Sequence, residues 1–397
     1  MSPSNGDHIK RIVGTLNERG QFRSLISLAS TPSRQSYEGM LRDLYKMLDI
    51  TKKADQKHAE AFYSIRRSKI SAPYNRYRDI YAFDRTAVRV PNDLKKWIGT
   101  SKANGAGGSD IGDVEELNDE DSGYLNANVI SDGKGSWWVA CQAPLPTTFH
   151  PFLMAILTRS ATFKHAHLFG VRSPQNVKHS PPGTAIIVQL TGLFEGTVAK
   201  ADQYLPTKVG RSVTYDAPDH VDSHPAIQLT LESTTHLPKT SSTLSTLTLS
   251  LASDEPELAI PPMTLHHYAY EGWPDFGVPQ GNDVNKLIEL IKEVENKKKE
   301  AGEAGCEVWV HCSAGVGRTG TYIALSSILN QSASQASSPS HPPFESPIGP
   351  LPEPLQDDPV ASLIDLLREQ RAVMCQSDSQ VKLVYDTYHQ KVQGKSH

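Results

Sequence analysis

The chain has 397 residues, with 40 Lys and Arg against 44 Asp and Glu, and a formal net charge of −4. It therefore lacks the excess of positive charge that binding to DNA or RNA requires. Its four cysteines show no metal-site spacing, and no apolar run reaches the roughly 18 residues of a membrane span. No apolar run follows the polar segment from Asp7 to Arg11, so no signal peptide is evident. We expect a soluble protein of the cytoplasm, with access to the nucleus left open.

The N-terminal part of the chain predicts helices after a loose start. A short helix is expected near His8–Leu28. Apolar residues from Tyr37 to Leu48 then recur at helical spacing, with Ser36 as the cap. We expect residues 1–59 to form an N-terminal extension, and residues 60–397 to form one large domain.

The rest of the chain alternates predicted strands and helices with three inserts. The inserts lie near 101–121, which is Gly-rich and then acidic, near 159–183, and near 332–359, which is Ser/Pro-rich and predicts disorder. Between them, apolar patterns predict a helix at 152–157, strands at 185–190, 227–231 and 244–251, and an amphipathic helix at 284–294. This mixture indicates an α/β (α+β) fold.

The run from Val310 to Gly320 (VHCSAGVGRTG) is the most informative stretch of the sequence. A short β-prone segment precedes it, and a helical pattern begins at Arg318, so the loop joins a strand to a helix N-terminus. There the first N–H groups lack partners and the helix dipole favours an anion. Gly315 and Gly317 allow the backbone to curl so that its N–H groups point inward. The sequence therefore predicts a phosphoryl-binding site.

The side chains of this loop predict a nucleophile. In such a field Cys312 is expected to be a thiolate at neutral pH, since cysteines in comparable fields titrate at roughly 3.5 to 7.5. Arg318 offers a planar fork for two phosphoryl oxygens, and the Thr319 hydroxyl is expected beside the sulfur. The alternative for an isolated cysteine is a buried structural thiol. A thiolate needs a reducing compartment.

The pattern HC-x5-R-T between a strand and a helix resembles the signature of the protein tyrosine phosphatase superfamily. The resemblance implies a single large domain with a central, highly twisted mixed β-sheet flanked by helices. It implies catalytic roles for His311, Cys312, Arg318 and Thr319. It also implies that the phosphate is bound along the loop, at Ser313, Ala314, Gly315, Val316 and Gly317.

The segment WPDFGVP at 273–279 resembles the mobile acid loop of tyrosine-specific members. A phenolate leaving group, with a pKa of about 10, needs a proton donor, and Asp275 is that donor by resemblance. Trp273 and Pro274 would support the loop. The alternative is a Pro-rich surface turn.

Two further segments resemble the family's recognition and glutamine loops. Tyr77 would form the wall of a pocket deep enough to select phosphotyrosine, and Asp79 would accept hydrogen bonds from the substrate backbone. Gln376 and Gln380 would position the hydrolytic water, because Gln offers both a donor and an acceptor. Ser377 stands where many members carry Thr.

A last resemblance concerns the partner of the catalytic arginine. The segment from Leu190 to Pro206 resembles the one whose glutamate clamps that arginine, which makes Glu195 the candidate partner of Arg318. Ala201 and Leu205 replace the usual Cys and Trp of this segment, and Ala143 replaces a usual Gly elsewhere.

Together these motifs predict a protein-tyrosine phosphatase that works without metal or cofactor through a phosphocysteine on Cys312. Its inserts resemble those of fungal, cytosolic, non-receptor members. We expect phosphotyrosine-containing proteins as partners, no nucleic acid, and a monomer. The alternatives are a phosphotyrosine-binding pseudophosphatase, and a dual-specificity or phosphoinositide phosphatase.

Overall fold

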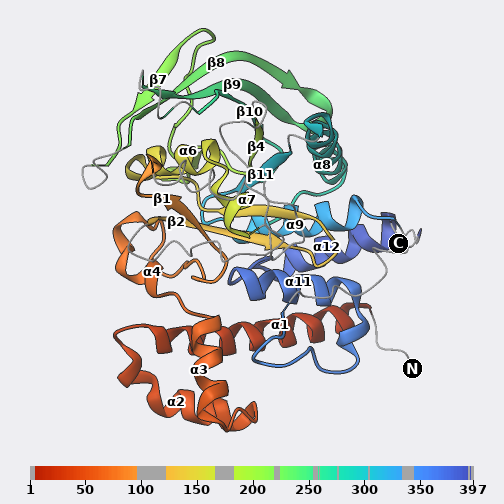
Figure 1. Ribbon diagram of the computed structural model, residues 1–397. Coiled ribbons are helices and arrows are strands. Elements are labelled where there is room, and N and C mark those ends of the chain that lie inside the picture. The colour runs from red at the N-terminus through yellow and green to blue at the C-terminus, as the bar shows by residue number, and fades with distance from the viewer. Residues whose placement is uncertain are drawn as a thin grey trace, which may run out of the picture.

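A computed structural model describes residues 5–95, 122–165, 183–218, 224–253, 258, 260–274, 277–302, 305–332, 344–391 and 394. Within these residues a nine-stranded sheet is the centre of the molecule (Figure 1), with strand order β1-β2-β3-β11-β4-β10-β9-β8-β7. The strands are β1 (Ala87–Pro91), β2 (Ser122–Ser131), β3 (Trp137–Cys141), β4 (Thr184–Gln189), β7 (Ser212–Tyr215), β8 (Ala226–Leu237), β9 (Ser242–Ala252), β10 (Met263–Tyr270) and β11 (Cys306–His311). A separate hairpin pairs β5 (Phe194–Glu195) with β6 (Val198–Ala199).

The sheet is mixed. Its central strands β3, β11, β4 and β10 run parallel to one another, and the outer pairs are antiparallel. Successive residues of β11 face opposite sides. Val308 and Val310 pack into one core cluster and Trp309 into another. Burial on both faces explains why Val308, Trp309 and Val310 form a continuous apolar run instead of alternating with polar residues.

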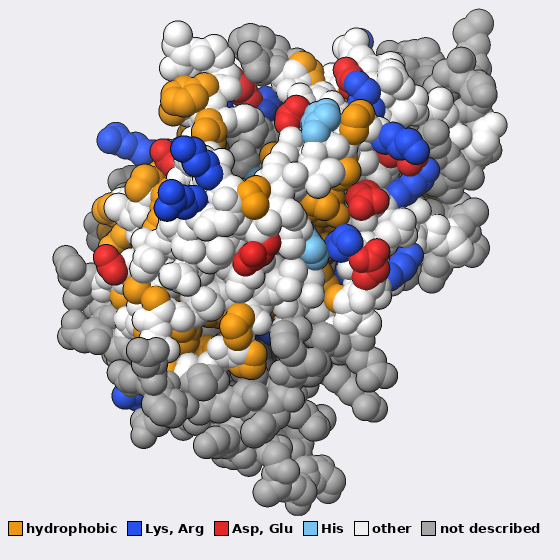
Figure 2. Space-filling view, turned by 90° about the horizontal axis from the view of Figure 1, so that it is seen from above, with side chains coloured by type: hydrophobic (Ala, Val, Ile, Leu, Met, Phe, Trp, Pro, Cys, Tyr) orange, Lys and Arg blue, Asp and Glu red, His pale blue; other side chains and the backbone are white. Residues whose placement is uncertain are grey.

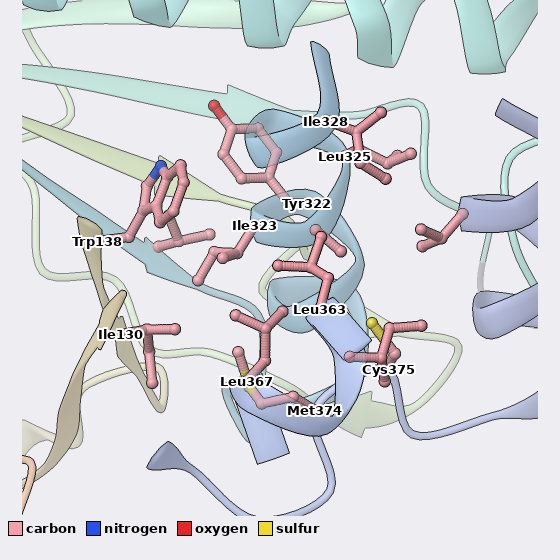
Figure 3. Close-up of a cluster of buried hydrophobic side chains, with 14 of the residues drawn as sticks. Ile130, Trp138, Tyr322, Ile323, Leu325, Ile328, Leu363, Leu367, Met374 and Cys375 are labelled. Atoms are coloured by element: carbon pink, nitrogen blue, oxygen red, sulfur yellow. The ribbon is translucent and has the colours of Figure 1, made fainter. Parts of the chain in front are cut away.

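Helices cover both faces of the sheet. The helices are α1 (Asn5–Ser27), α2 (Arg34–Met47), α3 (Lys53–Phe62), α4 (Arg66–Ile70), α6 (Phe149–Leu157), α7 (Ser160–His165), α8 (Asn282–Glu300), α9 (Gly317–Leu329), α11 (Pro359–Gln370) and α12 (Asp378–Lys391). Side chains of α6 and α7 pack on one face, and those of α8, α9, α11 and α12 pack on the other. Figure 3 shows this second cluster, in which α9 contributes Tyr322, Ile323, Leu325 and Ile328 opposite Leu363 and Leu367 of α11. The expected α/β fold with a mixed sheet and flanking helices is confirmed.

The long strands β8 and β9 extend the sheet at the top of the molecule (Figure 1). Seen from above, this face carries both basic and acidic side chains, with scattered apolar side chains between them (Figure 2). The predicted strands at 227–231 and 244–251 are present, but both are longer because they continue as one antiparallel pair.

Two expectations about the N-terminal and C-terminal parts are wrong. Helix α2 begins at Arg34, so Ser36 lies inside its first turn and does not cap it. Residues 344–359 are not disordered, because Arg19 donates hydrogen bonds to the carbonyl oxygens of Gly349 and Pro350, at 2.8 and 3.0 Å. Ile348 also packs into a third core cluster with α2 and α3. Residues 333–343, 101–121 and 166–182, which hold most of the predicted inserts, lie outside the described residues.

Candidate active site

The loop from Cys312 to Val316 connects the central strand β11 to helix α9, as predicted. The Gly315 N–H donates to Cys312 Sγ at 3.3 Å, so the loop curls around the sulfur. The thiol is 6% exposed. The sulfur and the start of α9 therefore face one small volume, the arrangement that an anion-binding loop requires.

Glycine is required at two positions of this segment. Gly315 has φ of +72°, and a β-carbon there would lie 2.0 Å from the carbonyl oxygen of Cys141 on β3. A β-carbon on Gly320 would lie 2.4 Å from the backbone nitrogen of Cys375. Both distances are too short for any side chain, so the loop and α9 pack directly against neighbouring backbone.

Arg371, at the end of α11, holds the loop from behind. Its Nε donates to Gly315 O at 2.8 Å and its Nη2 to Ala314 O at 3.1 Å. Its remaining bonds go to the side-chain oxygens of Asn126 and Asn128 on β2, both at 2.7 Å. Burial lowers the pKa of Arg371 to about 10, which still leaves it protonated at neutral pH. Sequence analysis assigned no role to Arg371. Its position just before the glutamine loop is the only sequence signal that could have identified it.

Arg318 is held in a fixed orientation by three segments. Its guanidinium forms an ion pair with Glu195 on β5, the partner that the resemblance implied. It also donates to Leu190 O and to Pro274 O, each at 3.3 Å. Glu195 in turn accepts from Thr191 Oγ1 at 3.1 Å. These contacts fix the plane of the guanidinium at the entrance of α9.

The predicted acid loop lies next to Arg318. Trp273 is buried, and its indole Nε1 donates to Gly277 O at 3.2 Å, which closes the loop's base. Arg318 lies 5.9 Å from the Trp273 ring centre. Asp275 itself lies outside the described residues. The residues that flank it are therefore the part of the loop that the structure places against Arg318.

Tyr77 is tied to the loop through Ser313. The Ser313 hydroxyl donates to Lys200 O at 2.6 Å, so the Tyr77 hydroxyl is the donor in its 2.7 Å contact with Ser313 Oγ. Asp79 is exposed two residues further on. The recognition segment thus borders the loop, with a half-buried tyrosine next to it and an exposed carboxylate farther out.

Gln376 and Gln380 lie over the start of α9. A β-carbon built on Gly317 would lie 3.0 Å from Gln380 Oε1 and 3.4 Å from Gln376 Oε1. Arg368 positions the backbone that leads to them, because it donates to Met374 O and Cys375 O, both at 2.9 Å. The predicted glutamine loop and the loop from Cys312 to Val316 are thus adjacent in space.

His311 and Thr319 are fully buried. His311 Nδ1 lies 3.0 Å from Cys312 O, which can only accept, and its Nε2 lies 2.9 Å from the Tyr204 hydroxyl. Burial lowers the pKa of His311 to about 4, so the ring is neutral, donates from Nδ1 and accepts from Tyr204. Within the described part of the chain, Thr319 Oγ1 has no hydrogen-bond partner.

The other three thiols lie outside this loop, on β3, at the start of β11 and directly before Gln376. Burial raises the pKa of Cys141, Cys306 and Cys375 to about 12 in each case. All four cysteines are free. The described residues contain no group of His, Cys, Asp and Glu side chains that could hold a metal ion, and none of their helices is long and apolar enough to cross a membrane.

Comparison with known proteins places this site in a family. A family model described as protein-tyrosine phosphatase matches residues 71–163 and 181–390. The chain belongs to the protein-tyrosine phosphatase family. All the loops described above lie within the matched segments, whereas helices α1 to α3 precede them.

Individual members of the protein-tyrosine phosphatase family show the extent of the similarity. Tyrosine-protein phosphatase 2 of Schizosaccharomyces pombe is 28% identical over 316 residues, which cover 79% of this chain and 33% of that protein. Receptor-type tyrosine-protein phosphatase F of Mus musculus is 27% identical over 266 residues, which cover 66% of this chain and 10% of that protein. The chain therefore spans a third or less of the length of these curated relatives.

A solved structure supports the fold. The crystal structure of the protein tyrosine phosphatase from Trypanosoma brucei aligns with a TM-score of 0.53 at 22% identity, over 90% of this chain and 95% of that one. The similarity thus extends over nearly the whole of both chains.

The close approach at Gly315 predicts a large cost for a single methyl group. Gly315→Ala should lower the free energy of unfolding by more than about 3 kcal/mol. The alanine would be strained at this positive φ, and its β-carbon would also clash with the backbone of Cys141. Gly210, with φ of +77° and no atom within 4 Å of a built β-carbon, provides the matched control. Gly210→Ala should cost only about 1 to 2 kcal/mol. Equal losses in urea unfolding would contradict the contact with Cys141.

Two buried imidazoles predict acid destabilisation. Burial lowers the pKa of His267 to about 3 and that of His311 to about 4. Below pH 6.5 both histidines are protonated in the unfolded chain but stay neutral in the native state, so the free energy of unfolding falls as the pH drops from about 6.5. Between pH 7 and 5 each histidine should remove about 2 kcal/mol. In urea unfolding, the free energy of unfolding of His267→Gln should fall between pH 7 and pH 5 by about 2 kcal/mol less than that of the wild type. An equal fall in both proteins would contradict the buried neutral ring.

Proposed function

We propose that this chain hydrolyses phosphotyrosine in proteins through a phosphocysteine on Cys312. One observation carries the proposal: a curled loop places the thiol of Cys312 at the N-terminus of α9, beside an arginine that Glu195 and two carbonyl oxygens hold in place. This arrangement supplies a nucleophile, N–H donors and a bidentate cation for one phosphoryl group.

In the first step, the Cys312 thiolate attacks phosphorus and the bond from phosphorus to the tyrosine oxygen breaks. The phosphoryl oxygens are held by Arg318 and by the loop N–H groups from Ser313 to Gly317. The phenolate receives a proton from Asp275, because a group with a pKa of about 10 is a poor leaving group at neutral pH. The products are phosphocysteine and the free tyrosine side chain.

In the second step, water attacks phosphocysteine and the S–P bond breaks. Gln376 and Gln380 orient this water, supported by their position over the start of α9. Asp275 now takes the proton from the water, and the leaving electron pair returns to Cys312 as a thiolate. Thr319, whose buried hydroxyl has no hydrogen-bond partner among the described residues, is the donor that stabilises this thiolate. His311 holds the backbone of Cys312 from behind.

Tyr77 supports specificity for phosphotyrosine. Its ring is tied to Ser313 and forms a wall beside the loop, so a long side chain reaches Cys312 and phosphoserine does not. Asp79 is exposed, as an acceptor for the substrate backbone must be. Ser313, Ala314 and Val316 are neutral, which disfavours a phosphoinositide phosphatase.

The partners and setting follow from this chemistry. We propose phosphotyrosine-containing proteins as substrates, no nucleic acid, and a monomer that needs no metal or cofactor. Four free cysteines and a thiolate nucleophile favour the reducing cytoplasm. We also propose the division into an extension, 1–59, and a catalytic domain, 60–397.

Replacing the nucleophile tests the phosphocysteine directly. Cys312→Ser should lower kcat on a phosphotyrosine peptide by more than about a hundredfold while peptide binding persists, because the loop N–H groups and Arg318 remain. Cys306→Ser, the same change at the other end of β11, is the control and should keep full activity.

EDTA should have no effect on the activity of the wild-type chain. A wild-type chain that binds the peptide without turnover would instead be a pseudophosphatase, and equal rates on phosphoserine would indicate dual specificity.

The role of Asp275 can be separated by leaving group. Asp275→Ala should lower kcat on phosphotyrosine peptides by about 10² to 10⁴, the usual contribution of a general acid. The loss should shrink for aryl phosphates whose phenols have a low pKa, since those barely need the proton. The alkaline limb of the wild-type pH profile should vanish in the variant. An equal loss on good and poor leaving groups, with that limb intact, would remove Asp275 from the acid role.

A further inference from the structure

Four charged side chains are buried between the N-terminal helix α1 and helix α11, which lie alongside each other (Figure 1). Arg19 and Arg23 of α1 and Asp365 and Glu369 of α11 are each no more than 6% exposed. Arg23 donates to Glu369 Oε1 at 2.7 and 3.1 Å and also bonds Asp365. Arg19 donates from Nε to both oxygens of Asp365, each at 3.1 Å. The two helices are therefore joined by paired charges in the interior.

The carboxylate of Glu369 has partners from three other segments of the chain. Besides Arg23, it accepts from the Tyr63 hydroxyl at 2.6 Å and from Ser346 Oγ at 2.8 Å. Burial alone would lower the pKa of Arg23, but Asp365 and Glu369 outweigh it and raise that pKa. Burial would raise the pKa of Asp365, but Arg23 and Arg19 outweigh it and lower that pKa, so Arg23 and Asp365 are both charged at neutral pH. Removing one partner would leave a buried charge uncompensated.

The same turn of α11 carries the arginine that fixes the glutamine loop. Arg368, directly before Glu369, donates to Met374 O and Cys375 O, the residues that precede Gln376. Its third nitrogen, Nη1, donates to Asn17 Oδ1 on α1 at 3.3 Å. Arg368 therefore bonds α1 and the glutamine loop at once, and Glu369 fixes the turn on which it sits.

We infer that α1 positions the glutamine loop, with Arg23 and Asn17 as positioning residues that act through Glu369 and Arg368. This inference rests on the proposed phosphatase reaction and concerns its second step, in which Gln376 and Gln380 orient water. Arg371 follows Glu369 by only two residues, but Asn126 and Asn128 of β2 also anchor it. The loop that Arg371 holds, and with it the first step, therefore depends less on α1. Helix α1 precedes the segments that match the family model.

Rapid-quench kinetics on 4-nitrophenyl phosphate test the inference, since they give separate rates for formation and hydrolysis of phosphocysteine. Arg23→Met should slow hydrolysis about tenfold, the scale of a small misplacement of a reacting group, and should change formation less than about twofold. Asn17→Ala should slow hydrolysis about threefold by the same argument. Both variants should accumulate phosphocysteine, which a loss of folded protein cannot produce.

Arg34→Met is the matched control. Arg34 pairs with Glu60 through two contacts of 2.6 and 2.8 Å between α2 and α3, in the same N-terminal part of the chain, and neither residue bonds α11 in the described structure. This variant should keep both rates. Wild-type hydrolysis in a folded Arg23→Met variant, or an equal loss in Arg34→Met, would overturn the inference.

Failure of Arg23→Met to fold and failure of the wild-type chain to react have different consequences. If Arg23→Met does not fold, the exposed residue Asn17 decides the question, and an unchanged hydrolysis rate in Asn17→Ala then overturns the inference. If the wild-type chain forms no phosphocysteine, the proposed function itself is wrong. Normal wild-type turnover with unaltered variants refutes only the role of α1.

Discussion

One buried guanidinium, that of Arg371, determines which way the peptide groups of the loop from Cys312 to Val316 point. It bonds the carbonyl oxygens of Ala314 and Gly315 from the side away from the thiol. A peptide group is planar, with its N–H opposite its carbonyl oxygen. Fixing these two oxygens therefore turns the N–H groups of Gly315 and Val316 toward the sulfur. The proposed binding of a phosphoryl group by this loop therefore depends on the Arg371 guanidinium, which fixes these carbonyl oxygens.

The same device recurs at each irregular segment around the site. Arg318 bonds the carbonyl oxygens of Leu190 and Pro274, and Arg368 bonds those of Met374 and Cys375. Loops that are buried or half-buried have carbonyl oxygens without a helix or sheet partner, and these must be satisfied. A guanidinium satisfies several at fixed angles, whereas a lysine offers a single flexible point charge. Three arginines thus hold four loop segments in one arrangement.

Sequence reasoning succeeded where the determinants are local. The strand, loop and helix around Cys312 follow from eleven neighbouring residues, and the partner of Arg318 followed from a resemblance. Arg371 was missed because its partner Asn128 lies 243 residues away in the chain. The ordered course of residues 344–359 was missed for the same reason, since Pro350 O is bonded by Arg19, 331 residues away. The start of α2 was misplaced because a single serine is a weak signal for a cap.

The charged contact between α1 and α11 fixes the relative position of the two helices more than it adds to the stability of the fold. Replacing a buried ionic cluster by apolar residues of similar volume is often neutral or stabilising, and Ile12, Val13 and Leu16 of α1 already supply apolar packing. Apolar packing alone, however, tolerates small shifts between helices. A slide of one turn, about 5.4 Å, would leave at least one arginine and one carboxylate of this cluster without a partner in the interior. The helices therefore pack in one register. Arg368 lies on the same turn of α11 as Glu369, so this register also determines the position of the carbonyl oxygens of Met374 and Cys375, which Arg368 bonds.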